Sequence, residues 1–475
     1  RQIPLRGRSF QGALFLAPGA ADVAARNFNT VEGSFATPGG DVGVSISGST
    51  GSENAYLIDG INTTDPGLGV VGAEVSQYFL REINVLTGGY QAEYGRATGG
   101  IVSLVTKSGS NELHGGVYGS VAPYQISGQG VARLGEALVR RTRPDMGTWD
   151  LGFDLGGALI KDRIWFYTGL AITNVNVRTE RRGRSQIFDG TGARDLADFV
   201  CPSYLSDSRY CDGPSKLAKQ TEELDYVQTQ AQTRAIYNGI AKLQFHLATD
   251  QDLFLSYIGS PNTRDTYYEY GTGDEGSKFT ESNQVHDLSL RYQGKTFGKK
   301  LQIDLTYAMH YQTQVQQPRL PNQPFTAYTA DAADPYSLAD FESVAACRRD
   351  AASGFNPCPI TRYVVGLGFH RSQELQRHQA LAGFTLFVNA LGVHAIKAGL
   401  DFEYLRSNLT SIATGQDGYR ATYNSTADGT DIFSGFGLGG KVNGVDTPLN
   451  SLTTVTSTRN YAVYLRDSWS VASTG

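Results

Sequence analysis

Apolar and polar side chains alternate through residues 301–312, LQIDLTYAMHYQ. Leu305 falls on the apolar face of this segment, and Asp304 falls on the polar face. A period of two held over this length predicts a β-strand with one apolar and one wet face. Residues 288–293 alternate in the same way, and a short polar turn at residues 297–300 joins the two segments into a predicted β-hairpin.

The same hairpin pattern recurs along the chain. In the segment 237–247, for example, Asn238 and Lys242 fall on the polar face. Further hairpins are predicted at residues 148–177 with a turn at 161–163, at 234–260 with a turn at 249–252, and at 376–408 with a turn at 389–392. A first strand near 112–124 and a last strand near 457–469 bring the total to about ten.

Short turns within the hairpins alternate with long connections between them. Bacterial outer-membrane barrels have this arrangement, with short periplasmic turns and long extracellular loops. The alternative is a soluble β-sandwich, which has no reason to place every long loop at one end. We therefore predict a transmembrane β-barrel in the bacterial outer membrane. Its extracellular loops are expected near residues 178–232, 261–283, 317–374 and 409–456.

Residues 1–108 differ from the rest, because they are rich in Gly, Ser, Thr and Asn and predict only short strands. These strands are expected near residues 42–46, 55–58, 82–86 and 101–106, in one small α+β domain. A domain of about 100 residues is roughly 30 to 35 Å across. Ten strands would close into a ring only roughly 20 Å wide, whereas twenty-two give about 44 Å.

The diameters of the domain and of the two possible rings predict that residues 1–108 form a plug in the lumen of a wide barrel. Residues 109–475 would be the first part of that barrel, with further strands after Gly475. The alternative is a domain outside a small, ten-stranded barrel. Open sheet edges are not tolerated in lipid, so a partial barrel could not stand alone in a membrane.

Composition supports a membrane location. The 475 residues are 40% hydrophobic and 18% charged, against roughly 25% charged residues in soluble domains. No run approaches the roughly 18 apolar residues of a transmembrane helix, so strands would have to cross the membrane. The 26 Tyr and 22 Phe residues suit the aromatic girdles of barrels. The net charge of −5, without a Lys/Arg-rich stripe, argues against a nucleic-acid partner.

The four cysteines form two local pairs, Cys201 with Cys211 and Cys347 with Cys358, in polar stretches between strands. We predict two loop disulfides and therefore an oxidising compartment. A metal site is the alternative, but neither pair has CxxC spacing and no His lies nearby.

No cofactor is expected, except that the acidic stretches 272–275 and 428–431 have the oxygen ligands that Ca²⁺ prefers. Such acidic loops are more often simply solvated.

Four segments together resemble one family, the Oar-like TonB-dependent outer-membrane transporters. AEYGRATGGIVSLVTKSGSN (Ala92–Asn111) resembles the end of their plug, where it passes into the barrel. IPLRGRSFQGALFLAPG (Ile3–Gly19) and VSISGSTGSENAYLIDGIN (Val44–Asn62) resemble earlier plug segments, and LGGALIKDRIWFYTGL (Leu155–Leu170) resembles a barrel hairpin. Each segment is weak evidence by itself, because Gly-rich turns occur in any β protein.

The resemblance implies a barrel of 22 antiparallel strands, of which about ten are present here. It also implies an active transporter that binds its ligand on the extracellular loops and the plug. A periplasmic TonB protein, driven by an inner-membrane energising complex, would pull on the plug. The TonB-contacting box of the family lies before the segment that Arg1 begins, so energy coupling is an expectation from kinship alone.

The loop NTTDPGLGVVG, residues 62–72, is the predicted plug apex, because it combines Asp-Pro-Gly turn chemistry with small residues that let a ligand approach. A plain connector is the alternative. Glu93 and Arg96 are predicted to latch the plug to charges on the barrel wall, against a merely solvated pair. The candidate ligand-binding residues of the apex are Asn62, Thr63, Thr64, Asp65 and Leu68.

Catalytic motifs are absent from the sequence, which has no HExxH, GxSxG or Walker pattern. His114, His246 and His310 fall on predicted lumen faces, where polar residues are expected, so we predict no enzyme. An outer-membrane hydrolase is the alternative.

Long loops with disulfides favour a large ligand, such as a peptide, protein or glycan. The rival hypothesis is an outer-membrane adhesin or structural barrel that transports nothing. The sequence leaves the substrate and the direction of transport open.

Overall fold

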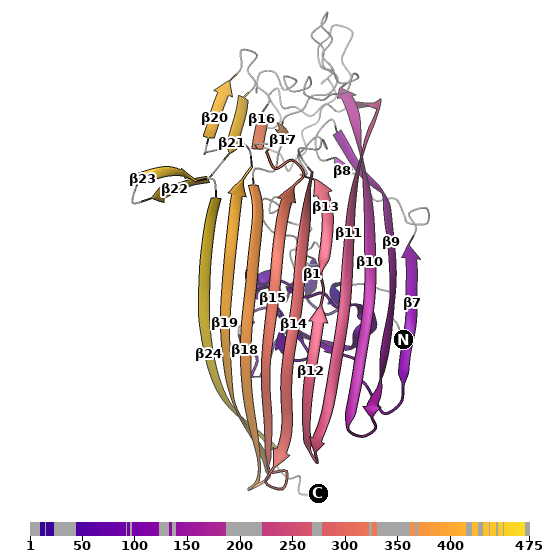
Figure 1. Ribbon diagram of the computed structural model, residues 1–475, viewed down its shortest axis with the longest axis vertical. Coiled ribbons are helices and arrows are strands. Elements are labelled where there is room, and N and C mark those ends of the chain that lie inside the picture. Colours follow the sequence, from indigo (N-terminus) through magenta and orange to yellow (C-terminus); the bar gives the residue numbers. More distant parts are fainter. Residues whose placement is uncertain are drawn as a thin grey trace, which may run out of the picture.

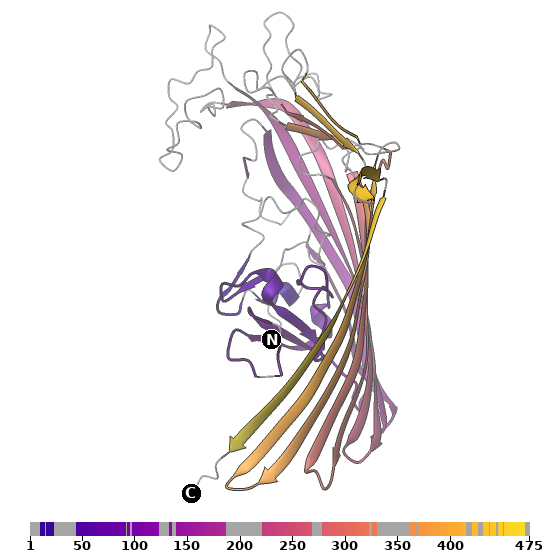
Figure 2. The same cartoon turned by 90° about the vertical axis from the view of Figure 1, so that its left-hand side faces the viewer.

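A long, curved sheet and a small domain against its concave face make up the computed structural model of the chain (Figures 1 and 2). We call the sheet the wall and the small domain, within residues 10–106, the plug. The structure describes residues 10–14, 16–22, 44–91, 93–95, 97–122, 133–134, 139–186, 221–267, 278–322, 325–329, 362–365, 369–414, 420–425, 431–436, 438–442, 445–449 and 451–470.

The wall is antiparallel throughout, and its main path contains ten strands in the order β24-β19-β18-β15-β14-β12-β11-β10-β9-β7. The predicted hairpins are confirmed. The strands are β7 (His114–Ala122), β9 (Val139–Ile160), β10 (Ile164–Gln186), β11 (Thr221–Ala248), β12 (Gln251–Gly259), β14 (Lys278–Thr296), β15 (Leu301–Pro318), β18 (Phe369–Asn389), β19 (Val393–Ala413) and β24 (Ser451–Ser470). Two short strands, β8 (Arg133–Leu134) and β13 (Asn262–Tyr267), pair with β9 and with β11 and β14 respectively.

The two faces of the wall differ as the alternation predicts. On β14 and β15, Asp287 lies opposite His310, and Leu290 lies opposite Tyr307. Tyr307 is 50% exposed on the outer face, whereas His310 is 1% exposed on the inner face. A slip of one residue would turn the polar row to lipid, at a cost of roughly 2 to 4 kcal/mol for each charge near the midplane. The register is therefore fixed by the membrane.

Strand pairing continues into all four stretches predicted as extracellular loops, and their place outside the membrane stays a prediction. β10 extends to Gln186 and β11 begins at Thr221, inside the predicted loop 178–232. Here the sequence is polar at consecutive positions, as in residues 178–186, RTERRGRSQ. Beyond the lipid both faces of a strand meet water, so the alternation disappears although the backbone ladder continues. Periodicity cannot detect such an extension.

Tight turns join the hairpins at one end of the wall, and the strand ends that precede and follow the long connections lie at the other end (Figure 1). Asp162, Asp250 and Leu391 have positive φ angles of 60°, 60° and 54° in three of these turns. At the opposite end lie two small sheets. One contains β16 (Phe325–Thr329), β17 (Arg362–Val365), β20 (Arg420–Ser425) and β21 (Asp431–Phe436), and the other is the hairpin of β22 (Leu438–Val442) and β23 (Val445–Leu449).

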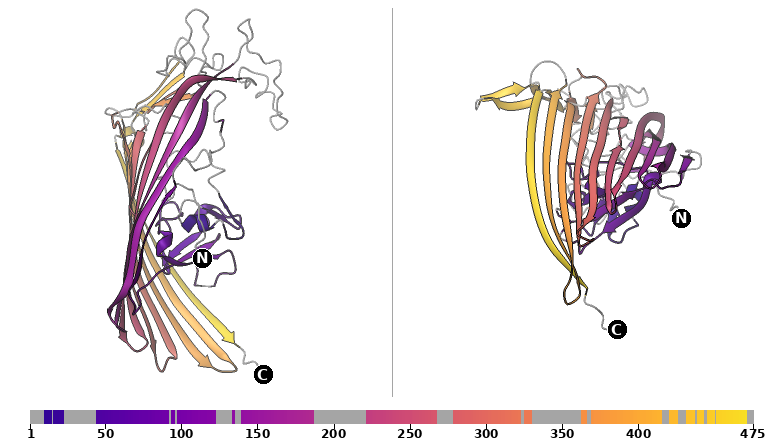
Figure 3. Two further views of the ribbon diagram at one scale, coloured as in Figure 1. Left: turned by 90° about the vertical axis from the view of Figure 1, so that its right-hand side faces the viewer. Right: turned by 60° about the horizontal axis from the view of Figure 1, so that its bottom comes forward.

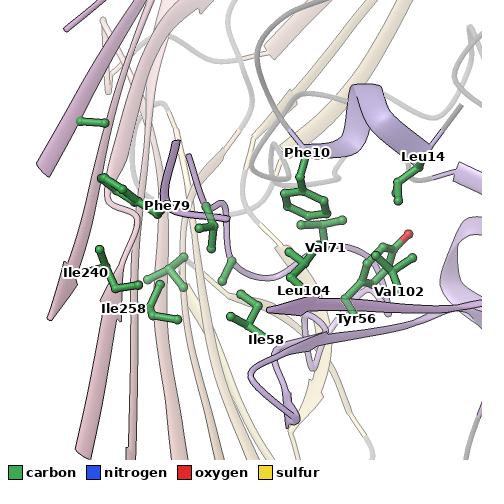
Figure 4. Close-up of a cluster of buried hydrophobic side chains, with 14 of the residues drawn as sticks. Phe10, Leu14, Tyr56, Ile58, Val71, Phe79, Val102, Leu104, Ile240 and Ile258 are labelled. Carbon is green, nitrogen blue, oxygen red and sulfur yellow. The ribbon is translucent and has the colours of Figure 1, made fainter. Parts of the chain in front are cut away.

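The plug contains a mixed four-stranded sheet in the order β4-β3-β6-β5, in which β3 and β6 run parallel. Its core packs Phe10 and Leu14 against Tyr56 and Leu104 (Figure 4). The predicted plug strands are confirmed, and short helical turns complete the domain. The elements are α1 (Phe10–Leu14), β1 (Ala20–Asp22), β2 (Val44–Ile46), η2 (Gly51–Glu53), β3 (Ala55–Ile58), β4 (Ile61–Asn62), η3 (Gln77–Phe79), β5 (Leu80–Leu86) and β6 (Ile101–Thr106).

No helix within the described ranges is long and apolar enough to cross a membrane. The predicted domain boundary after residue 108 falls between β6 and β7. The plug occupies the hollow of the curved wall in every view (Figures 2 and 3). Among the described strands, β7 and β24 each pair on one side only. An unpaired edge is not tolerated in hydrocarbon, and closure of the barrel at these two edges by further strands stays a prediction.

Candidate functional site

The predicted apex loop lies against the inner face of the wall. Asp65 is 1% exposed; its Oδ1 accepts hydrogen bonds of 2.8 Å from the backbone N–H groups of Gly67 and Leu68. Its Oδ2 accepts a hydrogen bond of 3.1 Å from Nε2 of Gln314 on β15. One carboxylate therefore both shapes the turn and binds the wall, which agrees with the predicted turn chemistry.

Residues on β18 and β19 hold the start of the same loop. Nη1 of Arg377 donates to the carbonyl oxygens of Asn62 and Thr64, at 3.1 and 2.7 Å. The backbone N–H of Asn62 donates to Oε1 of Gln379 at 3.2 Å, and its Nδ2 donates to Oε1 of Glu403 at 3.2 Å. Buried hydrogen bonds to charged groups are stronger than neutral ones. The loop is thus docked on the wall at several points.

This docking changes how the predicted ligand-binding residues are exposed. Thr63, Thr64 and Asp65 are buried, and Asn62 is half-buried, whereas Leu68 is 38% exposed. Ligand binding by this set stays a prediction. The wall partners were missed because inward polar residues occur at alternate positions on every strand. Nothing in the sequence marks which of them face the plug.

Glu93 of the plug lies against the wall near the edge formed by β24. Its carboxylate forms ion pairs with Lys397 of β19 and, at 3.5 Å, with Nη1 of Arg466 of β24. Arg466 also donates a hydrogen bond to Gln91. The partner predicted to act with Glu93, Arg96, lies outside the described residues. A plug carboxylate therefore contacts two wall cations at one point of the interface.

Three further ion pairs join the plug side to the wall, and sequence reasoning missed them. Asp59 pairs with Lys242 of β11 at 2.9 Å, and Lys107 pairs with Asp154 of β9 at 2.9 Å. Asp59 also accepts hydrogen bonds from the backbone and hydroxyl of Thr106, at 2.9 and 2.7 Å. The third pair joins Glu74 and Arg234 at 3.4 Å. Each pairing spans a long stretch of sequence, so no local pattern reveals it.

Apolar packing joins the plug to another part of the wall. Phe79 of the plug lies beside Ile240 and Ile258 of β11 and β12 (Figure 4). A Cβ atom on Gly169 of β10 would lie 2.5 Å from the Phe79 ring. Glycine is therefore required at position 169 for the ring to approach this closely.

Two cavities lie between the plug and the wall. The larger has a volume of about 320 Å³ and is lined by Asp59, Glu93, Asp304, Lys397 and Glu403, among others. The smaller, of about 170 Å³, shares Asp59, Arg291 and Thr306 with the larger one. Cavities with polar linings of this size hold water. The interface is accordingly hollow and polar near Glu93.

Two titratable groups inside the plug have shifted pKa values. The backbone N–H of Thr50, followed by its hydroxyl, lowers the pKa of Glu53, whose carboxylate closes a capping box on η2. Burial raises the pKa of the Tyr56 hydroxyl in the plug core. Nδ2 of Asn54 donates to that hydroxyl at 3.5 Å. The plug thus carries its own ordered polar contacts, separate from those to the wall.

The other predicted sites either lie outside the described residues or form simple side-chain pairs. Cys201, Cys211, Cys347 and Cys358 lie outside the described residues, as do the acidic residues 272–275 and 428–430. His310 is buried and pairs with Asp287 at 2.8 Å, and His246 pairs with Asp252 at 3.0 Å. In the part of the chain that the structure describes, no group of three His, Cys, Asp or Glu side chains is placed to hold a metal ion. The polar lumen residues serve contacts within the barrel.

Comparisons with known proteins agree with this architecture. A family model for the outer membrane beta barrel domain matches residues 203–474. The TonB-dependent transporter Oar of Myxococcus xanthus is 30% identical over an alignment that covers 98% of this chain and 44% of that protein. The outer membrane transporter YddB of Escherichia coli superposes with a TM-score of 0.58 at 14% identity, covering 98% of this chain and 53% of YddB. The YddB likeness shows the fold alone.

The chain spans about 44% of the length of Oar. Its place is the bacterial outer membrane, since the family match, the apolar outer face of the wall and the plug on its concave face all agree. The predicted resemblance is thereby confirmed. The chain belongs to the outer membrane β-barrel family and, within it, to the Oar-like TonB-dependent outer-membrane transporters, with a plug and ten strands of the wall described.

Proposed function

We propose that the protein carries out TonB-dependent active transport of a ligand across the bacterial outer membrane. The observation that supports this most is the interface between plug and wall, which is held at the apex loop and at Glu93 by hydrogen bonds and ion pairs. Each such bond to a charged group contributes a net of only about 1.5 to 3 kcal/mol, because water can replace it. A plug held in this way can be displaced and can return.

The proposed partners are TonB and its inner-membrane energising complex. TonB would act from the end of the wall that carries the tight turns, and the ligand would arrive from the end with the long connections (Figure 1). A large ligand, such as a peptide, protein or glycan, is the proposed substrate class. The apex residues Asn62, Thr63, Thr64, Asp65 and Leu68 are proposed to respond to it, with Leu68 the most accessible of the five.

Glu93 is the proposed plug latch, and Arg96 is proposed to assist it. The contacts with Lys397 and Arg466 support this role, because they bridge the plug to two neighbouring strands. Lys397 lies on β19, whose Glu403 also contacts Asn62 of the apex loop, so release at Glu93 would loosen the plug beside that loop. A latch of this kind would keep the unliganded barrel closed to the periplasm.

The proposal is tested with the full-length protein in its own outer membrane. Ligands that co-purify after solubilisation are identified by mass spectrometry, and their uptake is then measured in cells with and without TonB. We expect uptake to stop when TonB is deleted or when a protonophore collapses the proton-motive force. Binding and cell-surface function that persist unchanged, with no ligand movement in either background, would identify an adhesin or a structural barrel instead.

A further inference from the structure

The plug contacts two parts of the described wall in two different ways. We call its contact with β10, β11, β12 and β14 the dry seam, which includes Phe79, Gly169, Ile240 and Ile258. We call its contact with β15, β18, β19 and β24 the polar seam, which includes Gln314, Arg377, Gln379, Glu403 and Lys397. The difference bears on where the plug separates from the wall.

At the dry seam the hydrophobic core of the plug continues into the wall. One cluster of buried side chains contains Val71 and Phe79 of the plug together with wall residues. The wall members buried in this cluster are Tyr167, Ala171, Ile240, Ile258 and Val285, all from β10, β11, β12 and β14. In Figure 4 Phe79 reaches the wall beside Ile240 and Ile258. The ion pairs of Asp59 with Lys242 and of Glu74 with Arg234 also lie on these strands, and the smaller cavity, of about 170 Å³, borders them. Separating this seam would therefore break these ion pairs and expose the buried apolar cluster to water.

The chain itself ties the plug to the same side. After β6 it passes directly to β7 at the edge of the wall next to β9. Along this connection Lys107 pairs with Asp154, and Gly109 lies so close that an added Cβ would be 2.2 Å from the carbonyl oxygen of Phe166 on β10. The covalent link and the dry seam therefore hold neighbouring strands.

At the polar seam the described contacts are hydrogen bonds and ion pairs. They join Asp65 to Gln314, Asn62 to Gln379 and Glu403, and Glu93 to Lys397 and Arg466. The larger cavity, of about 320 Å³, lies along the same strands. Water already has room beside these groups and can take over each hydrogen bond as the partners separate. Opening here would expose buried Leu375 and Ala308, whereas the wall members of the continuous apolar cluster all lie at the dry seam.

We infer that the plug pivots on the dry seam and opens at the polar seam, so that the ligand passes between the plug and β15, β18, β19 and β24. This inference rests on the proposed transport function and adds its route. The route is lined by carboxylates, amides and the three cations Arg377, Lys397 and Arg466, so it suits a polar, hydrogen-bonding ligand rather than an apolar one. The dry seam stays closed while TonB acts and returns the plug to its place afterwards.

Two alanines on the wall allow a matched test. Ala308 of β15 is 2% exposed at the polar seam, and Ala171 of β10 is 3% exposed at the dry seam. Each is changed to cysteine in the full-length protein, and the rate of labelling by N-ethylmaleimide is measured in living cells. The unsubstituted protein gives the background from the four native cysteines. Cells treated with a protonophore, or lacking TonB, provide the unenergised state.

The expected result is that TonB activity speeds labelling of A308C by at least about fivefold, because a buried thiol reacts only when its site opens. Labelling of A171C should stay slow in both states. Equal acceleration at both positions, or acceleration at A171C alone, would overturn the pivot while leaving TonB-driven plug movement intact. No response to TonB at either position would overturn the transport proposal and the pivot together.

A second pair of cysteine variants keeps the test valid if a variant of the first pair fails to fold. Leu375 of β18 and Ile240 of β11 are both almost fully buried on the inner face. L375C is expected to behave like A308C, and I240C like A171C. Each variant is first checked for normal heat-modifiable migration and normal abundance in the outer membrane. A pair in which the dry-seam cysteine reacts faster under energised conditions would contradict the assignment.

Discussion

Arg377 of the wall donates a hydrogen bond of 2.7 Å to the carbonyl oxygen of Thr64 in the plug, across 313 residues of sequence. The same nitrogen reaches the carbonyl oxygen of Asn62. One buried guanidinium thus fixes the backbone of the apex loop, so the position of this loop depends on the wall and not on the plug alone.

Replacing Arg377 by Gln should loosen the apex loop. The two carbonyl oxygens lose a charged donor, which costs about 1.5 to 3 kcal/mol for such a bond. Hydrogen exchange of residues 62–72 should become faster, as mass spectrometry of the purified protein would show. R406Q is the matched control, because Arg406 lies exposed on the outer face of β19. Similar exchange in both variants would argue against a role for Arg377 in docking.

Adding a methyl group at Gly169 should push the plug away from the wall. In G169A the new Cβ would lie 2.5 Å from the Phe79 ring, and overpacking of this kind costs about 1 to 3 kcal/mol. We expect the plug of G169A to be digested faster by protease. The double variant G169A/F79L should recover part of the resistance, because leucine withdraws the ring atoms. A double variant more sensitive than G169A would contradict this packing.

The Glu93–Lys397 pair should show energetic coupling. In a double-mutant cycle of E93Q, K397Q and the double variant, we expect a coupling of about 1 kcal/mol, since both side chains are partly exposed and salt screens them. Urea titration of the plug, followed by limited proteolysis, gives the free energies. The coupling should shrink at high salt. Additive effects at low salt would show that the latch contributes no stability.

Acid should weaken the cap on η2. Glu53 has an ordinary pKa of 4.5, and the hydrogen bond from the backbone of Thr50 lowers it in the folded protein. A lowered folded-state pKa means that the stabilisation is complete above pH 4.5 and is lost as pH falls through the folded value. Protection of the amide hydrogens at residues 50–54, taken relative to the intrinsic exchange rate at each pH, should therefore fall in acid. In E53Q it should show no such dependence on pH.

A charge on the outer face should impair membrane insertion in a depth-dependent manner. Leu400 of β19 faces outward within the apolar belt, and L400R should cost roughly 2 to 4 kcal/mol. Thr410, on the same face of β19 but beyond the belt, should tolerate the change T410R at roughly 0 to 1 kcal/mol. Folding into lipid vesicles during urea titration measures both. Equal costs would contradict the depth assigned to the two residues.

The wall could be predicted from the sequence because the membrane imposes a simple rule on it. Lipid outside and polar contacts inside force alternation, so the turn at residues 297–300 and the faces of Leu305 and His310 follow from local pattern. The extensions of β10 and β11 could not be predicted, because water on both sides removes that rule. Strand pairing there depends on neighbours that a single segment does not reveal.

The contacts of the plug were harder to predict. The turn around Asp65 was recognisable, but its wall partner Gln314 has the same local pattern as many other inward polar residues. Glu93 lies beside two wall cations, and neither Lys397 nor Arg466 could be named as its partner without the folded barrel. Apolar contacts such as Phe79 with Gly169 depend on shape at close range, which a periodic pattern does not encode.

The length of β11 has a consequence for how far from the bilayer a ligand is first met. Its 28 residues correspond to a contour of about 90 Å at 3.3 Å per residue, while the hydrocarbon belt is only about 25 Å tall. Even with the usual tilt of barrel strands, several tens of ångströms of hydrogen-bonded ribbon stand clear of the lipid. Under the proposed transport function, a ligand would first meet hydrogen-bonded strands well above the lipid and would have to travel several tens of ångströms before it reaches the plug.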